Sequence, residues 1–406
     1  MRISTNQIQI AAGERMVDQQ SKLSKVQQQV STGLRVMKPS DDPVASAQLI
    51  NFQNVKRQVE QYQANSGAAT ARLSLESGVL EGVTEVLQRA RELAVYGNNG
   101  SQTNETRSYI AEEIDQLNEE LMGLANTIDA EGEFLFAGSK GRFRPFSRDV
   151  KGQYVYSGDD TQRSIKIGPR RTIPVNDTGT EVFRKIREGN GEFVVRESPN
   201  NKGSGVVDQG TVSGEYNHGV FAIIFDKKES PHWNEPLTYK VIDEKGQVIV
   251  PPGTKFVEGN DIKFEGVQFF IQGKPEVGDF FVIRPSGHKD AFTMLSDLSK
   301  ALKQARSGDS EKAHLHNEVN LALSGIDASL DRSLDVSADV GTRLRALDNQ
   351  KRINEDFLIQ LASMQSNVED LDYGKAMTEF NLRKAGLDAS QKSFVRVQDL
   401  NLFNYI

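Results

Sequence analysis

The sequence predicts an α+β protein: a long antiparallel helical rod formed by both chain ends, carrying an inserted, mainly-β outer domain. Three observations support this prediction. Residues 141–290 hold 10 of the 12 prolines, 19 of the 34 glycines and the only tryptophan, Trp233. The two flanking arms instead repeat apolar residues at helical spacing. The middle alternates short apolar runs with turn residues, as strands do.

Five segments are expected. Residues 1–42 form an N-terminal assembly segment and residues 368–406 a C-terminal one, both disordered in the monomer. Residues 43–140 and 291–367 form the two halves of the rod, and residues 141–290 form the β domain.

The composition excludes several classes of protein. Of 406 residues, 37% are hydrophobic, and the mean hydropathy is -0.51, which suits long helices with much exposed surface. The net charge of -7 gives no electrostatic reason to expect nucleic acid or an anionic membrane as a partner. The absence of cysteine excludes disulfides, thiolate zinc sites and cysteine nucleophiles. No apolar run reaches 18 residues and the first residues lack an apolar core, so we expect neither a membrane span nor a cleaved signal peptide.

The N-terminal arm carries one long apolar stripe. Asp42-Pro43 supplies an N-cap and a first helical residue. Alternating steps of three and four residues from Phe52 give the stripe Val55, Val59, Tyr62, Ser66, Ala69, Leu73, Glu76, Leu80, Val83, Leu87, Ala90 and Ala94. Gly97-Asn98-Asn99-Gly100 ends it with residues that tolerate left-handed geometry. A second helix should follow, with its stripe at Ile110, Ile114, Leu117, Leu121, Leu124 and Ile128.

The C-terminal arm has a matching stripe, with Ser333 and Ser337 as polar gaps. Its apolar positions are Val319, Leu323, Ile326, Leu330, Val340, Leu344 and Leu347, and after a slip of one residue Phe357, Leu361, Met364, Val368 and Leu371. A narrow apolar seam is unstable alone in water, so the two arms need each other. We expect them to pack antiparallel, with both chain ends at one end of the rod.

The extreme ends are amphipathic but have no core of their own beyond each other. The residues expected at an assembly interface are Met16, Leu23, Val26, Val30, Met377, Phe380, Leu387, Phe394, Val397 and Leu400. Such segments tend to fold when several copies pack together. Packing within the chain, onto the rod, is the alternative.

The middle predicts one or two small antiparallel sandwiches or barrels. The expected strands are Gln153–Ser157, Ser164–Ile167, Phe193–Arg196, Val220–Phe225, Leu237–Ile242, Ile262–Phe264, Val267–Ile271 and Phe280–Ile283. One short helix is expected near Thr180–Glu188.

Three possible reactive sites have ordinary explanations. His314 and His316 are two residues apart, so on a helix they point to different faces and are expected to be helix-surface residues. Gly158-Asp159-Asp160 has the residues of a hairpin turn. Gly203-Ser204-Gly205 lacks the lysine and the third glycine of a phosphate loop.

The basic cluster Arg142, Arg144 and Arg148, interleaved with Phe143 and Phe146, is short and lies where the rod enters the β domain. A contact at that junction is the expected role. We therefore expect no catalytic residue, no metal site, no cofactor and no enzymatic activity.

Three blocks resemble the flagellin family. The first is Val30-Ser31-Thr32-Gly33-Leu34-Arg35-Val36, leading into Pro39-Ser40-Asp41-Asp42-Pro43. The second is Leu87–Val95 followed by Asn98-Asn99-Gly100, and the third is Val368-Glu369-Asp370-Leu371-Asp372-Tyr373. The PSDDP sequence, and an ending at Leu402–Ile406 that departs from the Leu-Leu-Arg-like end of flagellins, are more similar to the hook–filament junction members of the family.

The resemblance implies a function, a place and partners. Such a subunit is exported unfolded by the flagellar type III apparatus and is a structural adaptor in the extracellular flagellum. Its implied partners are the hook-associated protein on the hook side, flagellin on the filament side, further copies in a ring, and an export chaperone that binds the C-terminal segment. No cofactor, nucleic acid or membrane is implied.

The resemblance also suggests that Arg89, Glu92 and Leu93 could bind a flagellin-sensing Toll-like receptor, although these residues also serve the rod's seam and lateral contacts. Three other functions stay open from the sequence. The chain could be a filament flagellin, a carbohydrate-binding or hydrolytic β domain on a helical stalk, with Trp233 and Tyr239 as the candidate region, or a cytosolic coiled-coil scaffold.

Overall fold

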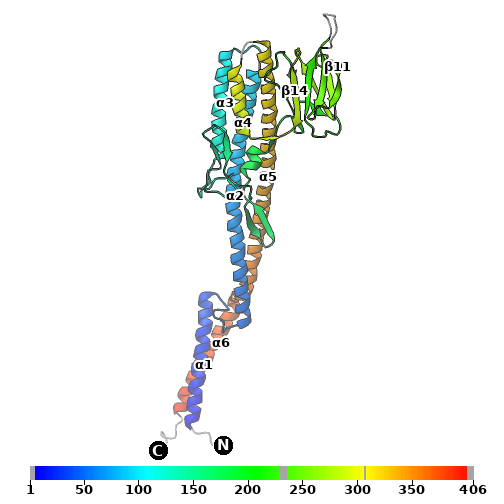
Figure 1. Cartoon of the computed structure of the whole chain (residues 1–406). Helices are drawn as coiled ribbons and strands as arrows, with labels where there is room; N and C mark the ends of the chain where they lie inside the picture. Colours follow the sequence, from blue (N-terminus) through cyan, green and yellow to red (C-terminus); the bar gives the residue numbers. More distant parts are fainter. Residues whose placement is uncertain (1–4, 228–235, 306–307, 400–406) are drawn as a thin grey trace, which may run out of the picture. The chain divides into compact units, whose positions relative to one another are not determined.

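Six helices account for most of the chain. The computed structural model describes residues 5–227, 236–305 and 308–399 (Figure 1). The helices are α1 (Thr5–Thr32), α2 (Pro43–Gly97), α3 (Asn104–Ala125), α4 (Ala291–Gln304), α5 (Asp309–Glu369) and α6 (Tyr373–Asp399). By their contacts the residues form two units, one of Met1–Ser66 with Asn349–Ile406 and one of Gly67–Asp348. We call them the terminal unit and the central unit.

The strands all lie between α3 and α4. They are β1 (Phe146–Arg148), β2 (Tyr154–Tyr156), β3 (Ser164–Gly168), β4 (Arg171–Pro174), β5 (Ile186–Arg187), β6 (Phe193–Glu197), β7 (Val206–Val207), β8 (Thr211–Val212), β9 (Phe221–Asp226), β10 (Thr238–Asp243), β11 (Val248–Lys255), β12 (Asp261–Phe264), β13 (Val267–Gln272), β14 (Phe280–Pro285) and β15 (His288–Lys289). Each of the eight segments predicted as strands overlaps one of these strands, with ends that differ by no more than two residues.

In the central unit, α2 and α5 pack antiparallel, as the two stripes predict. Arg91 Nε lies 2.6 Å from an Asp327 carboxylate oxygen, and the Thr84 hydroxyl lies 3.2 Å from the Ser333 hydroxyl. Residue numbers thus decrease along α2 while those of the partners on α5 increase, so the helices run in opposite directions. The apolar core of the unit includes Leu73, Leu80, Leu87, Val319, Ile326 and Leu347. Ser333 is a buried gap in the stripe, and its hydroxyl donates to the Leu80 carbonyl at 3.4 Å.

Helix α4 was not predicted as a separate element, although its signal is present. Asp290 caps it by accepting from the Thr293 N–H at 2.8 Å. Its apolar residues Ala291, Leu295, Leu298 and Leu302 are buried in the central core, and the helix packs along α3. The rod of the central unit is therefore built from α2, α3, α4 and α5. Helix α4 has only 14 residues, so its apolar stripe is much shorter than that of the adjoining α5 and gives a weaker signal.

Two sheets form a sandwich from Phe193 to Pro285. One has strand order β11-β10-β9-β14-β6, and the other has β12-β13-β7, with β8 also paired to β13. Alternate residues of the strands fill a separate apolar core, for example Phe221, Ile223 and Phe225 of β9. The segment before the sandwich behaves differently, because Phe146, Ile173 and Phe183 are buried in the core of the helices.

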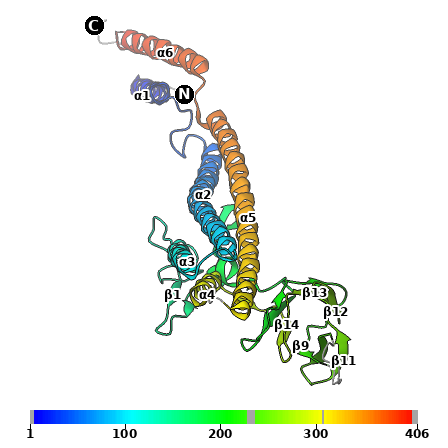
Figure 2. The same ribbon diagram turned by 90° about the horizontal axis from the view of Figure 1, so that it is seen from above.

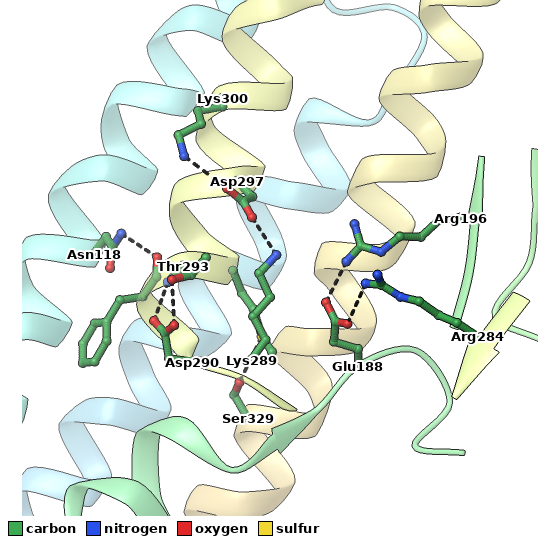
Figure 3. A network of polar contacts seen from close by, with 12 residues as sticks. Asn118, Glu188, Arg196, Arg284, Lys289, Asp290, Thr293, Asp297, Lys300 and Ser329 are labelled. Carbon is green, nitrogen blue, oxygen red and sulfur yellow. Dashed lines mark hydrogen bonds and ion pairs between the residues drawn. The ribbon is translucent and has the colours of Figure 1, made fainter. Parts of the chain in front are cut away.

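Polar contacts fix the sandwich to the rest of the central unit, first to the loop after β5 and then to helix α5. Figure 3 shows the carboxylate of Glu188, which is buried, between the guanidinium groups of Arg196 and Arg284, at 2.6 and 3.3 Å. On α5, the Asn317 amide donates to Glu197 at 2.8 Å and to the Gly205 carbonyl at 3.0 Å, and accepts from the Val207 N–H at 2.9 Å.

The short helix predicted near Thr180–Glu188 is present as a π-helix at Thr180–Arg184, shorter than predicted because strand β5 follows it. Two other predicted details were wrong. Ile128 does not belong to the second helix, because α3 ends at Ala125, and its side chain is 53% exposed. His314 and His316 are half-buried rather than on the helix surface, because Glu197 and Asn98 pack on them at 2.6 Å each.

Candidate assembly surface

The first and third of the recognised sequence blocks bind each other in the terminal unit. Leu34 and Asp370 form an antiparallel bridge, the Arg35 N–H donates to the Glu369 carbonyl at 2.7 Å, and the Leu371 N–H donates to the Gly33 carbonyl at 2.9 Å. We call these residues, 33–35 and 368–371, the terminal clasp. It joins the end of α1 to the start of α6, and these two helices pack along each other (Figures 1 and 2).

The block sequence explains the geometry of the clasp. Gly33 has φ +74°, a left-handed conformation that side chains disfavour, and a Cβ there would lie 3.0 Å from the Tyr373 hydroxyl. The Arg35 guanidinium donates to the Val368 carbonyl at 2.7 Å and to Asp42 at 3.1 Å. One arginine therefore ties the end of α5 to the residue that precedes α2.

The PSDDP sequence forms the turn before α2. The Asp41 carboxylate accepts from the N–H groups of Met37 and Lys38, and pairs with Lys25 at 2.8 Å. Asp42 accepts from the Ala45 N–H at 3.0 Å, which confirms it as the helix N-cap. The Lys25 hydrogen bond lowers the pKa of Asp41, and the Ala45 hydrogen bond lowers that of Asp42.

A small apolar cluster supports the clasp from one side. Val36, Ala45 and Leu49 are buried, and Phe52 and Val368 pack against them. Residues from both chain ends therefore share one core.

The terminal unit exposes much apolar surface. It holds under a third of the chain but 13 of the 27 exposed large apolar side chains of the described residues. They are Ile10, Val17, Val44, Ile50, Val55, Ile353, Phe357, Ile359, Met364, Tyr373, Met377, Leu382 and Val395. We call this set the terminal apolar surface. So much exposed apolar surface on thin helices is typical of a protein–protein interface.

The residues expected at the assembly interface lie on the two paired helices. Val26 is buried, Met377 is 44% exposed, and six are half-buried: Met16, Leu23, Val30, Phe380, Leu387 and Phe394. Because α1 and α6 pack on each other, part of this burial comes from the chain itself. The side chain of Val397 and the whole of Leu400 lie outside the described residues.

Several exposed residues of the terminal apolar surface were missed by sequence reasoning. Ile10 and Val17 on α1 are 56% and 68% exposed, and Leu382 and Val395 on α6 are 69% and 55% exposed. A signal for α1 was present in the sequence. Ile10 and Val17 are seven residues apart, as Met16 and Leu23 are, and Val17 directly follows Met16. The predicted interface contains only the Met16–Leu23 stripe of α1.

The segment at Arg89, Glu92 and Leu93 lies on α2 in the central unit. Arg89 donates to Glu113 of α3 at 2.7 Å and to Glu92 at 3.1 Å. The hydrogen bond to Glu113, and to a smaller extent that to Glu92, raises the pKa of Arg89 above its usual range. Leu93 is buried in the core, so only Arg89 and Glu92 are accessible.

Other clusters of charge have partners within the chain. Asp129, Glu131 and Glu133 bring carboxylate oxygens within 4.8 Å of one another. Arg72 contacts Asp129, and Arg163 lies 2.5 Å from Glu133, so two guanidinium groups offset two of the three carboxylates.

The sites for which the sequence offered ordinary explanations have structural roles. Asp159 accepts from the Ser139 and Thr161 N–H groups, as a turn residue does. Arg148 lies over the Tyr154 ring, 4.8 Å from its centroid, and 3.4 Å from Glu119, whereas Arg142 and Arg144 are exposed.

Comparisons with known proteins decide the family. Residues 3–141 match the family described as the bacterial flagellin N-terminal helical region. A solved structure of the flagellar junction protein FlgL from Legionella pneumophila is 32% identical, covers 79% of this chain and 99% of its own, and has a TM-score of 0.72. The chain belongs to the flagellar hook-associated protein 3 (FlgL) family.

Two further relatives agree with this FlgL assignment. The crystal structure of flagellar hook-associated protein 3 from Legionella pneumophila is 31% identical over 78% of this chain and 98% of its own, with a TM-score of 0.74. Flagellar hook-associated protein 3 of Salmonella typhimurium is 25% identical over 99% of both chains. These FlgL relatives are named as structural parts of the flagellum. In the described part of this FlgL-family chain, no helix is long and apolar enough to cross a membrane.

Proposed function

We propose that this chain is the structural adaptor that joins the flagellar hook, through the neighbouring hook-associated protein, to the flagellin filament. The observation that carries the proposal is the terminal apolar surface on helices held together by the clasp. In water this surface is unfavourable, at roughly 25 cal/mol per Å² of apolar area, so a neighbouring subunit that covers it gains affinity. The Salmonella relative aligns over 99% of this chain, a share that includes most of these helices.

The finer assignments belong to this proposal. The partners are the hook-associated protein on one side, flagellin on the other, and further copies of the chain in a ring. The segments at residues 1–42 and 368–406 are disordered in the monomer and fold on assembly. The chain leaves the cell unfolded through the flagellar type III apparatus, and an export chaperone holds its C-terminal segment first. It has no enzymatic activity.

Immunogold electron microscopy of intact flagella tests the location. Label confined to the boundary between hook and filament is expected. Label along the whole filament would instead identify a filament flagellin, the alternative that the relatives support less.

Substitution in α6 tests the assembly surface. Phe394→Asp should abolish assembly, because a charge would enter an apolar interface, while the central unit stays folded. Gln391→Asp is the matched control, since Gln391 is exposed on the same helix and gains the same charge. Assembly is measured by incorporation into flagella and folding by circular dichroism. Loss of helicity in the central unit of Phe394→Asp, or equal assembly of both variants, would count against the proposal.

Receptor binding through Arg89 and Glu92 would compete with contacts inside the chain, since Arg89 already pairs with both Glu92 and Glu113. A reporter-cell assay with the soluble monomer tests it, and no response disposes of it.

A further inference from the structure

The turn between α2 and α3 holds an exposed Asn-Gly pair with unusual contacts. Asn99 and Gly100 are both exposed, and nothing lies within 4 Å of a Cβ placed on Gly100. The Asn99 side-chain oxygen Oδ1 accepts from the N–H and the hydroxyl of Ser101, both at 3.1 Å. These two donors polarise the side-chain carbonyl toward attack at Cγ.

The backbone of Asn99 is polarised as well. Its carbonyl oxygen accepts from Arg107 Nη2 at 3.2 Å and from the Gln102 N–H at 3.1 Å. Arg107 is positively charged and only 5% exposed, so its field is weakly screened. This peptide group includes the Gly100 N–H, which has no hydrogen-bond partner among the described residues. A cation on the carbonyl stabilises the negative charge that forms when this N–H loses its proton.

We propose that Asn99 is a site of spontaneous deamidation, promoted by Arg107 and Ser101. The Gly100 nitrogen, losing its proton to water, attacks Asn99 Cγ. A bond forms between these two atoms, the bond from Cγ to Nδ2 breaks, and the amide nitrogen takes a proton from water and leaves as ammonia. Water then opens the succinimide ring at either carbonyl and gives aspartate or isoaspartate. No oxidant, metal or enzyme is needed.

The chain contains an internal comparison at Asn190-Gly191. There the Asn190 side-chain oxygen also accepts from two donors, the N–H groups of Glu192 and Phe193. However, the Gly191 N–H donates to the Glu188 carbonyl at 3.2 Å, and Asn190 Nδ2 donates to the Gly210 carbonyl at 3.2 Å. The Gly191 nitrogen, which would be the nucleophile, and the Asn190 side-chain amide are therefore both held by hydrogen bonds. We expect these bonds to protect Asn190 from deamidation in the folded chain.

The modification would change the turn chemically. An aspartate adds one negative charge next to Arg107, and an isoaspartate also lengthens the backbone between two rod helices. The neighbouring Asn98 contacts His316 of α5 at 2.6 Å, so the altered turn lies beside a contact between helices.

Peptide mapping by mass spectrometry of the full-length folded chain, aged at mildly alkaline pH, tests the proposal. Asn99 should deamidate about tenfold faster than Asn190, equivalent to about 1.4 kcal/mol in the barrier. In urea the two rates should become similar, because both are Asn-Gly sequences. Equal rates in the folded chain, or an unchanged difference in urea, would overturn the role given to the structure.

Two variants separate the proposed contributions. Gly100→Ala has room for its methyl group and should slow the reaction at Asn99 strongly by crowding the nucleophile. Ser101→Ala removes one of the two donors to Oδ1 and should slow it about threefold or more, while Asn190 is unaffected. Helicity by circular dichroism verifies that both variants are folded. An unchanged rate at Asn99 in Gly100→Ala would refute attack by the Gly100 nitrogen.

Discussion

Glu76 has its carboxyl group in the driest part of the central unit. The residue has no exposed surface, and its Oε1 accepts from the Asp177 N–H at 3.0 Å, while Oε2 has no hydrogen-bond partner among the described residues. The nearby Arg343 is already bound by both oxygens of Asp177, at 2.9 Å each. Burial, and then the charge of Asp177, raise the pKa of Glu76 to about 8.

This pKa predicts how stability depends on pH. Between about pH 4.5, the value expected in the unfolded chain, and about pH 8, the native state holds a proton that the unfolded state has lost. The free energy of unfolding should therefore fall as the pH rises through this window, by on the order of 4 kcal/mol from this group. Glu76→Gln mimics the protonated form and should remove that dependence. It should match the parent near pH 5 and exceed its stability near pH 8.

Urea denaturation across this pH range measures the effect. Glu81→Gln is the control, because Glu81 is exposed on the same helix and its substitution should leave the parent's pH profile unchanged. A Glu76→Gln variant that loses stability with pH as steeply as the parent would show that Glu76 is ionised in the folded chain.

Among the elements, α5 carries buried and exposed apolar residues on different faces. Ile326 is 1% exposed and Leu334 is 55% exposed, two turns further on. Ile326→Ala should reduce the free energy of unfolding by about 2–4 kcal/mol, because it leaves a cavity in the helical core. Leu334→Ala should change it by about 0.5 kcal/mol or less. Equal losses in denaturant titrations would mean that the stripe does not face the core.

The clasp should depend on Arg35. Its guanidinium is partly exposed, so Arg35→Ala should destabilise the pairing of α1 with α6 by about 1 kcal/mol, through loss of the hydrogen bonds to Val368 and Asp42. Hydrogen exchange of α6 amides in the assembled state, in which we propose that this segment is folded, measures this, and they should exchange faster. Arg57→Ala is the control, because Arg57 is exposed on α2 and outside the clasp. Unchanged exchange in Arg35→Ala would show that the backbone contacts alone hold the clasp.

The long stripes could be predicted from the sequence because helical periodicity is local and repeats many times. The strands could be recognised because short apolar runs bounded by turn residues are also a local signal. The clasp could not, since nothing local indicates that Arg35 donates to a carbonyl 333 residues away. Glu76 interrupted its stripe as a polar residue, but its partner Asp177 lies in a distant loop. The proposed assembly residues are predicted from amphipathic spacing, and their contacts depend on neighbouring subunits that one sequence does not contain.

At the scale of the whole molecule, the sandwich should be dispensable for the rod's fold. Its core, which includes Phe193, Val241 and Ile283, is separate from the core of the helices. Replacing residues 194–284 by a short glycine-rich linker should therefore preserve cooperative unfolding of the helices, with a modest loss because Glu197 no longer contacts α5. Thermal unfolding followed by circular dichroism is the measurement. Loss of the helical transition would show that the two cores fold as one.

The pairing of β6 with β14 has one more consequence. Phe193, where the sandwich begins, lies directly opposite Pro285, where it ends, in neighbouring strands of one sheet. The two points at which the chain enters and leaves the sandwich are thus one strand spacing apart, about 5 Å. Any foreign domain whose own ends lie equally close could be grafted at this position without stretching the helices. The position could thus accept another domain, and exchange of the outer domain would require compensating changes in the rod only where the sandwich contacts it, as at Asn317.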